Sequence, residues 1–195
     1  MEDQLKNKIL IITAPSGAGK TSITHHLMQT FPQLEFSVSA ATRKPRINET
    51  EGLDYHFMSE TAFKEKILLN EFVEWEMVYE GKYYGTLRSV LGKIWEKGKI
   101  PVLDIDVKGA IHVQQQYPRN SISLFIETPS VEELKKRLES RGTETAESLT
   151  ARVNKAAYEL SFKEQFNQHI INDNLERACL EAEKIVRVFL QSPLV

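Results

Sequence analysis

The chain has 195 residues, enough for one domain with a substantial hydrophobic core. Hydrophobic residues make up 41% and charged residues 27%, which is typical of a globular protein in water. The formal net charge of −2 excludes a global positive field for holding nucleic acid or an anionic membrane, so an anion site must be a local group of Lys and Arg side chains.

The cysteine content and the N-terminus both indicate a cytoplasmic protein. The single cysteine, Cys179, excludes an internal disulfide and a cysteine metal cluster, and one free thiol is typical of a reducing compartment. Because Cys179 lies in a helix-like run, we interpret it as a packing residue. The N-terminal apolar run is four residues long, too short for a signal peptide or a membrane span.

The first predicted elements are a strand and a helix joined by a glycine-rich turn. Residues 8–14, KILIITA, form an apolar run that predicts a buried strand. Residues 19–31 carry Ile23, Leu27 and Met28 at helical spacing and predict a helix that stops near Pro32.

The turn between them, APSGAGKTS, nearly matches the phosphate-loop pattern G-x-x-x-x-G-K-[ST]. In such a loop backbone N–H groups surround the phosphates, Lys20 reaches the terminal phosphates and Thr21 places a hydroxyl on Mg²⁺. Ala14 replaces the first glycine, a small departure unless that residue needs a positive φ. The alternative is an ordinary strand–turn–helix, but spacing, Thr21 and context favour a nucleotide site. The predicted ATP-binding residues of the loop are Ala14, Pro15, Ser16, Gly17, Ala18, Gly19, Lys20, Thr21 and Ser22.

Residues 35–92 have a different texture and predict a β-rich insert that closes over a ligand. The segment 36–46 alternates, 47–57 is polar and turn-rich, and 61–70 is helical. An aromatic, strand-like stretch at 71–85 turns at Glu80 and Gly81, and residues 86–98 are helical.

The remaining chain alternates strands with helices, which predicts a mainly parallel α/β sheet covered on both faces. Strands are expected at 99–107, 121–128 and 169–173, and helices at 108–117, 130–142, 143–166 and 174–190. Ser130 and Glu133 have capping-box spacing. Asp104 and Asp106 end a buried strand, where carboxylates commonly hold Mg²⁺, although helix caps or solvated aspartates are the alternative.

Two groups of arginines are candidate anion ligands. Arg137 and Arg141 share a helix face, either as a solvated charge ladder with Glu133 or as a lid over transferring phosphates, with Arg152 as a third member. Arg43 and Arg46 flank a stiff Lys-Pro turn and form a plausible phosphate clamp, near which Tyr55 and Tyr84 could donate hydroxyl hydrogen bonds.

The motifs TAPSGAGKT, SVSAATRKPR, EGLDYHF, EFVEW, YYGT, LDIDVKGA and RLESRGTET occur in this order along essentially the whole chain. Taken together, the ordered set resembles the guanylate kinase family of P-loop nucleoside monophosphate kinases. The resemblance implies Mg²⁺-dependent phosphoryl transfer from ATP to GMP, and also to dGMP. It implies a P-loop NTPase three-layer fold with ATP held by a core (1–36, 93–129 and 159–195), a β-rich GMP-binding lobe (37–92) and a small helical lid (130–158).

The resemblance also implies roles for individual residues. Lys20, Arg43, Arg137, Arg141 and Arg152 are the implied catalytic residues, and Thr21 and Asp104 the metal ligands. Asn172 falls on the adenine side of ATP. The implied GMP-binding residues are Ser39, Arg43, Arg46, Tyr55, Glu74, Tyr84, Thr86 and Asp106. The implied partners are small molecules rather than nucleic acid or membrane, and the protein is expected to be a monomer or a homodimer.

The chemistry of guanine is compatible with these roles. Glu74 can accept from N1–H and N2–H of guanine while the Ser39 hydroxyl donates to O6, and adenine would leave that carboxylate unpaired. The sequence departs from the family pattern at Ala14, Asn48, Thr86 and Lys108. Only Lys108 adds a charge, beside the expected GMP lobe.

Two other hypotheses remain open at this point. A non-catalytic domain of the same fold would bind phosphorylated peptides, but such modules typically have an eroded phosphate loop. A P-loop kinase with a different acceptor is the other, and the Ser39 and Glu74 pair argues against it.

Overall fold

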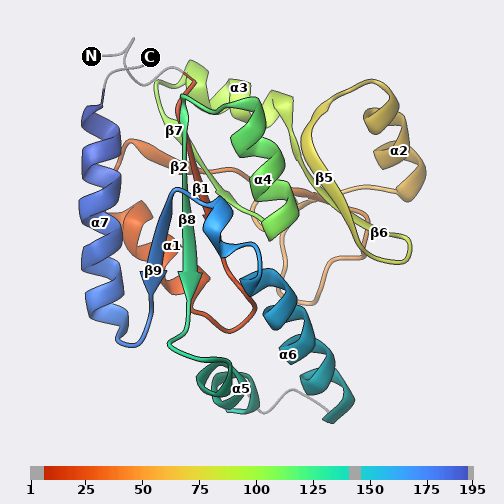
Figure 1. The fold of residues 1–195 in the computed structure, drawn as a ribbon. Helices are drawn as coiled ribbons and strands as arrows, with labels where there is room; N and C mark the ends of the chain where they lie inside the picture. Colours follow the sequence, from red (N-terminus) through yellow and green to blue (C-terminus); the bar gives the residue numbers. More distant parts are fainter. Residues whose placement is uncertain (1–6, 141–145, 193–195) are drawn as a thin grey trace.

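The computed structural model describes residues 7–140 and 146–192. Its core is a five-stranded sheet in the order β2-β7-β1-β8-β9 (Figure 1). The strands are β1 (Ile9–Thr13), β2 (Leu34–Phe36), β7 (Ile100–Asp104), β8 (Ser121–Glu127) and β9 (Gln168–Ile171), and all neighbouring pairs are parallel. The carboxyl ends of the strands therefore meet at one edge of the sheet, where ligands bind in open α/β folds.

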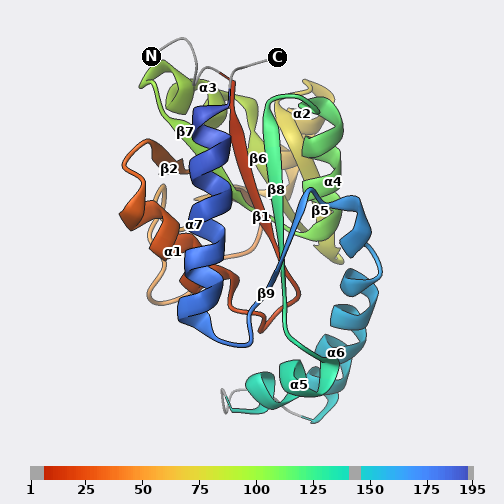
Figure 2. The ribbon, with the colours of Figure 1, turned by 60° about the vertical axis from the view of Figure 1, so that its left-hand side comes forward.

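Helices cover both faces of this sheet. Alternate residues of β1 point to opposite faces, and because both sets are apolar, each face is buried under helices. Leu10 and Ile12 pack with α1 (Lys20–Thr30) and α7 (Leu175–Gln191). Ile9 and Ile11 pack with α3 (Arg88–Glu96) and α4 (Val107–Gln116). Figure 2 shows α7 lying across one face of the sheet. This three-layer, mainly parallel arrangement confirms the predicted fold class.

A second, four-stranded sheet in the order β4-β3-β6-β5 forms the lobe. It contains β3 (Ala40–Ala41), β4 (His56–Phe57), β5 (Phe72–Tyr79) and β6 (Lys82–Leu87), with α2 (Glu60–Leu68) packed against it. Gly81 has φ 68° at the hairpin turn, a conformation that glycine adopts without strain. The β-rich insert predicted from the sequence is therefore a sheet of its own beside the core.

The helices α5 (Val131–Glu139) and α6 (Ala146–Leu160) pack together at the bottom of Figure 1, in the segment predicted to be the lid. Leu134, Leu138 and Ala156 form their shared apolar core. The Ser130 hydroxyl accepts a hydrogen bond from the Glu133 N–H at 3.2 Å, as the capping-box spacing predicted. A 3₁₀ turn, η2 (Lys163–Gln165), follows and leads into β9.

The predicted element bounds differ from the structure at several ends. Thr86 belongs to β6 rather than to the following helix, which begins at Arg88. Strand β7 ends at Asp104, and α4 already begins at Val107. Strand β2 was not predicted because it has only three residues, yet it pairs with β7 from Leu34 to Phe36. Among the described helices, none has the length and apolar composition needed to cross a membrane.

A buried lysine directly before β1 contacts the C-terminal end of α7. The Lys8 side chain is 2% exposed, and its ammonium donates to the carbonyl oxygens of Phe189, Leu190 and Ser192 at 2.7, 3.2 and 2.6 Å. These carbonyls lie at the C-terminal end of α7, where backbone acceptors lack helical partners and a cation is favoured. Lys8 thus acts as a cap made by a residue far away in sequence.

We expect Lys8→Met to lower the free energy of unfolding by about 2 kcal/mol, because it keeps the apolar stem but removes a charged donor from three carbonyls. Urea denaturation followed by circular dichroism measures the change. Lys97→Met is the matched control, since Lys97 forms an exposed ion pair with Glu35 and its loss should cost about 0.5 kcal/mol or less. Equal stability of the two variants would contradict the capping role.

Candidate active site

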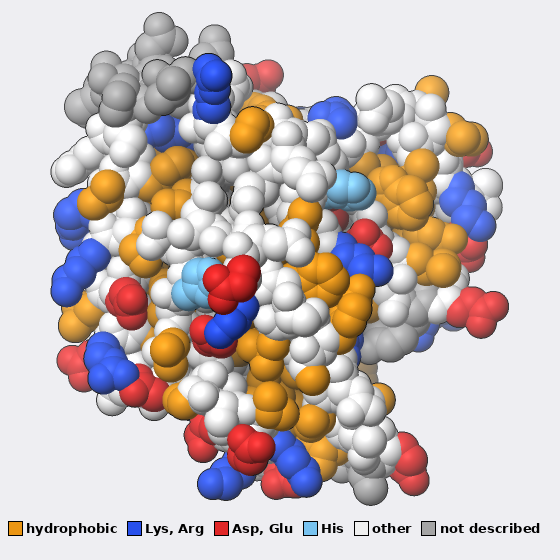
Figure 3. Space-filling view, viewed as in Figure 1, with side chains coloured by type: hydrophobic (Ala, Val, Ile, Leu, Met, Phe, Trp, Pro, Cys, Tyr) orange, Lys and Arg blue, Asp and Glu red, His pale blue; other side chains and the backbone are white. Residues whose placement is uncertain are grey.

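A cavity of about 470 Å³ opens between the core, the lobe and the lid. Figure 3 shows the molecular outline hollowed between the lobe at the right and the lid at the bottom. The loop after β1 forms one wall, the lobe strands form another, and the carboxyl end of β7 and helix α6 complete it. The predicted site residues that line the cavity are Ala14, Pro15, Ser16, Gly17, Gly19, Lys20, Thr21, Ser22, Ser39, Arg43, Arg46, Tyr55, Glu74, Tyr84, Asp104 and Asp106.

The loop has the backbone geometry of an anion cradle. Gly17 and Gly19 have φ values of 98° and 97°, which other residues rarely adopt. Ala14 is not among the described residues with positive φ, so the missing first glycine costs no backbone strain. Ala18 is buried between the two glycines and packs into the core instead of lining the cavity.

Asn172 stabilises this loop through a hydrogen bond to its backbone. Its side chain is buried, and its amide donates to the Ala18 carbonyl at 2.7 Å. A Cβ on Gly19 would collide with the same amide, so glycine is required here for packing as well as for φ. The structure therefore gives Asn172 a supporting contact, while the contact with adenine implied by the family resemblance stays a prediction.

Lys20 and Asp104 form an ion pair at the base of the cavity. The pairing follows from the sheet register, which places Asp104 beside Ile12 at the start of the loop. The Lys20 ammonium also lies 3.4 Å from the carbonyl oxygen of Ile105. Asp106 caps α4 by accepting from the Gly109 N–H at 2.8 Å and also lines the cavity, so the two sequence interpretations of this residue are compatible.

Three side chains of the lobe, Glu49, Tyr55 and Tyr84, form a cage around the Arg43 guanidinium. It donates to both oxygens of Glu49 at 2.5 and 2.7 Å and to the Tyr84 hydroxyl at 3.1 Å, and it stacks over Tyr55 at 4.8 Å from the ring centre. The hydrogen bonds from Arg43 lower the pKa of Glu49 to about 2. Arg46, by contrast, is 79% exposed at its side chain. Glu49 was missed in the sequence, where its only signal is an acid three residues after Arg46.

Glu74 lies on β5 and is only 6% exposed, yet one face of it reaches the cavity. The Thr86 hydroxyl donates to its Oε1 at 2.6 Å. Burial raises the pKa of Glu74 to about 7, against the opposing effect of that hydrogen bond. Thr86 itself is fully buried, so in this structure it orients Glu74, and direct contact between Thr86 and a ligand stays a prediction.

The lid arginines differ from one another. Arg137 donates to Glu133 on its own helix at 3.2 Å, the charge ladder that the spacing allowed. Arg152 donates from α6 to the Ser16 hydroxyl of the loop at 3.2 Å. Arg141 lies outside the described residues. Sequence reasoning missed two further residues of α6 that line the cavity, Lys155 and Glu159.

The fold and the cavity define a P-loop kinase with a second, β-rich lobe and a separate pair of helices beside the loop. The guanylate kinase family model matches residues 6–188. The guanylate kinase of Bacteroides fragilis is 43% identical over 183 residues, which cover 94% of this chain and 90% of the relative. That of Salinibacter ruber is 43% identical over 184 residues, covering 94% and 97%. This chain therefore belongs to the guanylate kinase family.

Solved structures agree with this assignment. The crystal structure of guanylate kinase from Anaplasma phagocytophilum superposes with a TM-score of 0.77 at 28% identity, covering 97% of this chain and 88% of that one. The crystal structure of TT1252 from Thermus thermophilus, with a TM-score of 0.53 and 16% identity, shares the fold alone.

Proposed function

We propose that this chain transfers the terminal phosphoryl group of ATP to GMP and dGMP, with Mg²⁺ as the metal. The observation that carries the proposal is that one cavity contains both the phosphate loop with Lys20 and the carboxylate of Glu74 on the lobe. Membership of the guanylate kinase family supports it.

We assign the core to residues 1–36, 93–129 and 159–195, the GMP-binding lobe to 37–92 and the lid to 130–158. The separate sheet of the lobe and the separate apolar core of the lid support this division. Two boundaries lie within helices, because α3 continues to Glu96 and α6 to Leu160.

On the donor side, the loop N–H groups and the Lys20 ammonium would hold the β- and γ-phosphates of ATP. Lys20 would exchange its Asp104 partner for phosphate oxygens, which is feasible because both side chains are partly exposed. The Thr21 hydroxyl and the freed Asp104 carboxylate are hard oxygen donors that suit Mg²⁺. When bound, the metal neutralises charge that develops on the phosphate oxygens.

On the acceptor side, Arg43, Arg46, Tyr55 and Tyr84 would bind the GMP phosphate. Arg43 is already oriented by its cage, although Glu49 occupies its two terminal nitrogens and must share them with the incoming phosphate. Glu74 would accept from guanine N1–H and N2–H, Ser39 would donate to O6, and Asp106 lines the same cavity.

The lid would complete the site. Arg152 already reaches the loop through Ser16, and Arg137 would have to leave Glu133 to contact a phosphate. Preorganised cations around a transferring phosphoryl group stabilise its spread charge, and closure excludes water. We also propose a cytoplasmic location, which the single buried thiol of Cys179 supports.

The test is an ADP-release assay with ATP and each of GMP, dGMP, AMP, CMP and UMP. We expect turnover with GMP and dGMP, and kcat/KM lower by about 10⁴ with AMP, because AMP leaves the buried Glu74 without donors. Equal turnover of AMP would contradict the proposed acceptor.

A further inference from the structure

Four cations line the cavity among the residues that the structure describes, and one of them has no role in the reaction proposed above. Lys20, Arg43 and Arg46 serve the donor or acceptor phosphates as proposed above. The fourth is Lys155, the only lid cation among the described residues of this lining. The described part of this lining also contains six carboxylates, so a reaction between two anionic nucleotides needs every available cation.

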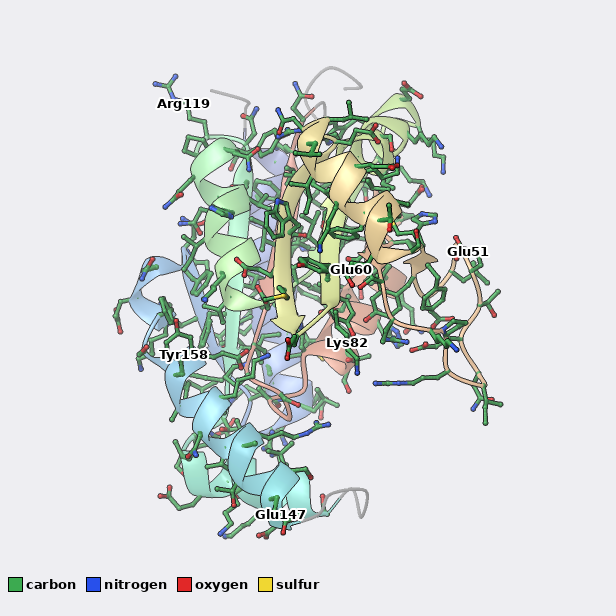
Figure 4. The ribbon with its side chains drawn as sticks, turned by 90° about the vertical axis from the view of Figure 1, so that its right-hand side faces the viewer. Glu51, Glu60, Lys82, Arg119, Glu147 and Tyr158 are labelled. Atoms are coloured by element: carbon green, nitrogen blue, oxygen red, sulfur yellow. The ribbon has the colours of Figure 1, made fainter. Side chains whose placement is uncertain are left out.

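The position of Lys155 follows from the helix geometry of α6. It lies one turn after Arg152, which contacts Ser16 of the loop, and residues three apart share a helix face. In Figure 4, α6, marked by Glu147 and Tyr158, lies below the tip of the β5–β6 hairpin, marked by Lys82. Lys155 also borders a smaller cavity of about 140 Å³ with Glu76 and Asp106. It thus stands between the loop and the lobe.

Glu159 keeps the Lys155 side chain at the cavity. The two side chains pair at 3.7 Å on successive turns of α6. Glu159 is buried, which raises its pKa, and the positive charges of Lys155 and Lys20 oppose that effect. The Lys155 side chain is 47% exposed, so its ammonium can contact a ligand in the cavity while it stays paired with Glu159.

We infer that Lys155 contacts the phosphoryl group during its transfer and stabilises its charge from the lid side. The inference rests on the proposed function. A lysine suits this role because its ammonium is a compact charge on a flexible stem, which can follow the phosphoryl group from donor to acceptor. The contact forms when the lid closes, so its loss should appear in kcat more than in KM.

The test compares Lys155→Met with Lys155→Arg. We expect Lys155→Met to lower kcat about tenfold while KM for ATP and for GMP changes less than about twofold. Lys155→Arg should restore kcat to within about threefold of the wild type. The complex of ADP, fluoroaluminate and GMP, which mimics the phosphoryl group in transfer, should bind Lys155→Met about tenfold more weakly, with ADP alone unaffected.

The matched control is Lys135→Met on the other lid helix. Lys135 pairs with Glu139 at the same spacing and at 3.9 Å, outside the lining of this cavity, so its kcat should equal that of the wild type. If Lys155→Met had the kcat of the wild type, the inference about Lys155 would be wrong and the proposed function would stand. A similar loss in Lys155→Arg together with a lower melting temperature would also overturn it, because that pattern indicates a structural role. A wild-type chain inactive with GMP would overturn the proposed function as well.

Discussion

Replacing Lys20 by alanine is expected to lower kcat/KM for ATP and GMP by about 10³-fold or more while the fold persists. The Lys20 ammonium is the cation of the loop, directly after the two glycines with positive φ. Removing one preorganised donor to a transition-state charge typically costs a factor of about 10² to 10³. The neighbouring Asp104 would also lose its cation, adding repulsion toward the incoming phosphates.

Steady-state kinetics by ADP release and circular dichroism of the same samples measure these two expectations. Lys93→Ala is the control, because Lys93 is an exposed lysine on α3, away from the cavity lining. Retained turnover in Lys20→Ala would show that the loop is not the ATP site.

The second large effect concerns Glu74 and the acceptor base. Glu74→Gln keeps the shape of the side chain and its contact with Thr86 but replaces one acceptor oxygen by an NH₂ group that would face a guanine donor. Two buried donors that face each other without an acceptor lower kcat/KM for GMP by about 10²-fold or more. KM for ATP should change less than about twofold, because the loop is unchanged.

The pH dependence of the wild type tests the same residue. The pKa of Glu74 is raised to about 7, so the carboxylate that accepts from guanine predominates only above that pH. KM for GMP should therefore be low and constant near pH 8 and rise by about tenfold per pH unit below 7. The phosphate of GMP itself takes up a proton near pH 6. In Glu74→Gln the titration of the GMP phosphate should remain, and the titration of residue 74 near pH 7 should be absent.

Two results would contradict this assignment. If Glu74→Gln raised KM for ATP and left that for GMP unchanged, the lobe would not be the acceptor site. If the pH profiles of the wild type and Glu74→Gln coincided, the titrating group would be the phosphate alone.

Local patterns in the sequence determined the nucleotide chemistry of this protein. Gly17, Gly19, Lys20 and Thr21 lie within five residues, and the helix that follows them forms from hydrogen bonds between residues near in sequence, so the geometry of this loop is encoded locally. The alternation of apolar strands with helices was likewise sufficient for the parallel sheet, since such a sheet must be covered on both faces. The ordered motifs indicated the family.

Only the tertiary structure decided which distant side chains meet. The sheet register pairs Lys20 with Asp104, the parallel sheet brings Asn172 after β9 to the Ala18 carbonyl, and the β5–β6 hairpin places Thr86 opposite Glu74. These contacts give Asn172 and Thr86 a supporting role in the fold, and their predicted ligand contacts stay predictions. Lys155 and Glu159 on α6 carry no local motif, so their place at the cavity appears only when α6 packs over the loop. The physical reason is that spacing along a chain specifies which face of an element a residue occupies, whereas the packing of elements far apart in sequence specifies what that face contacts.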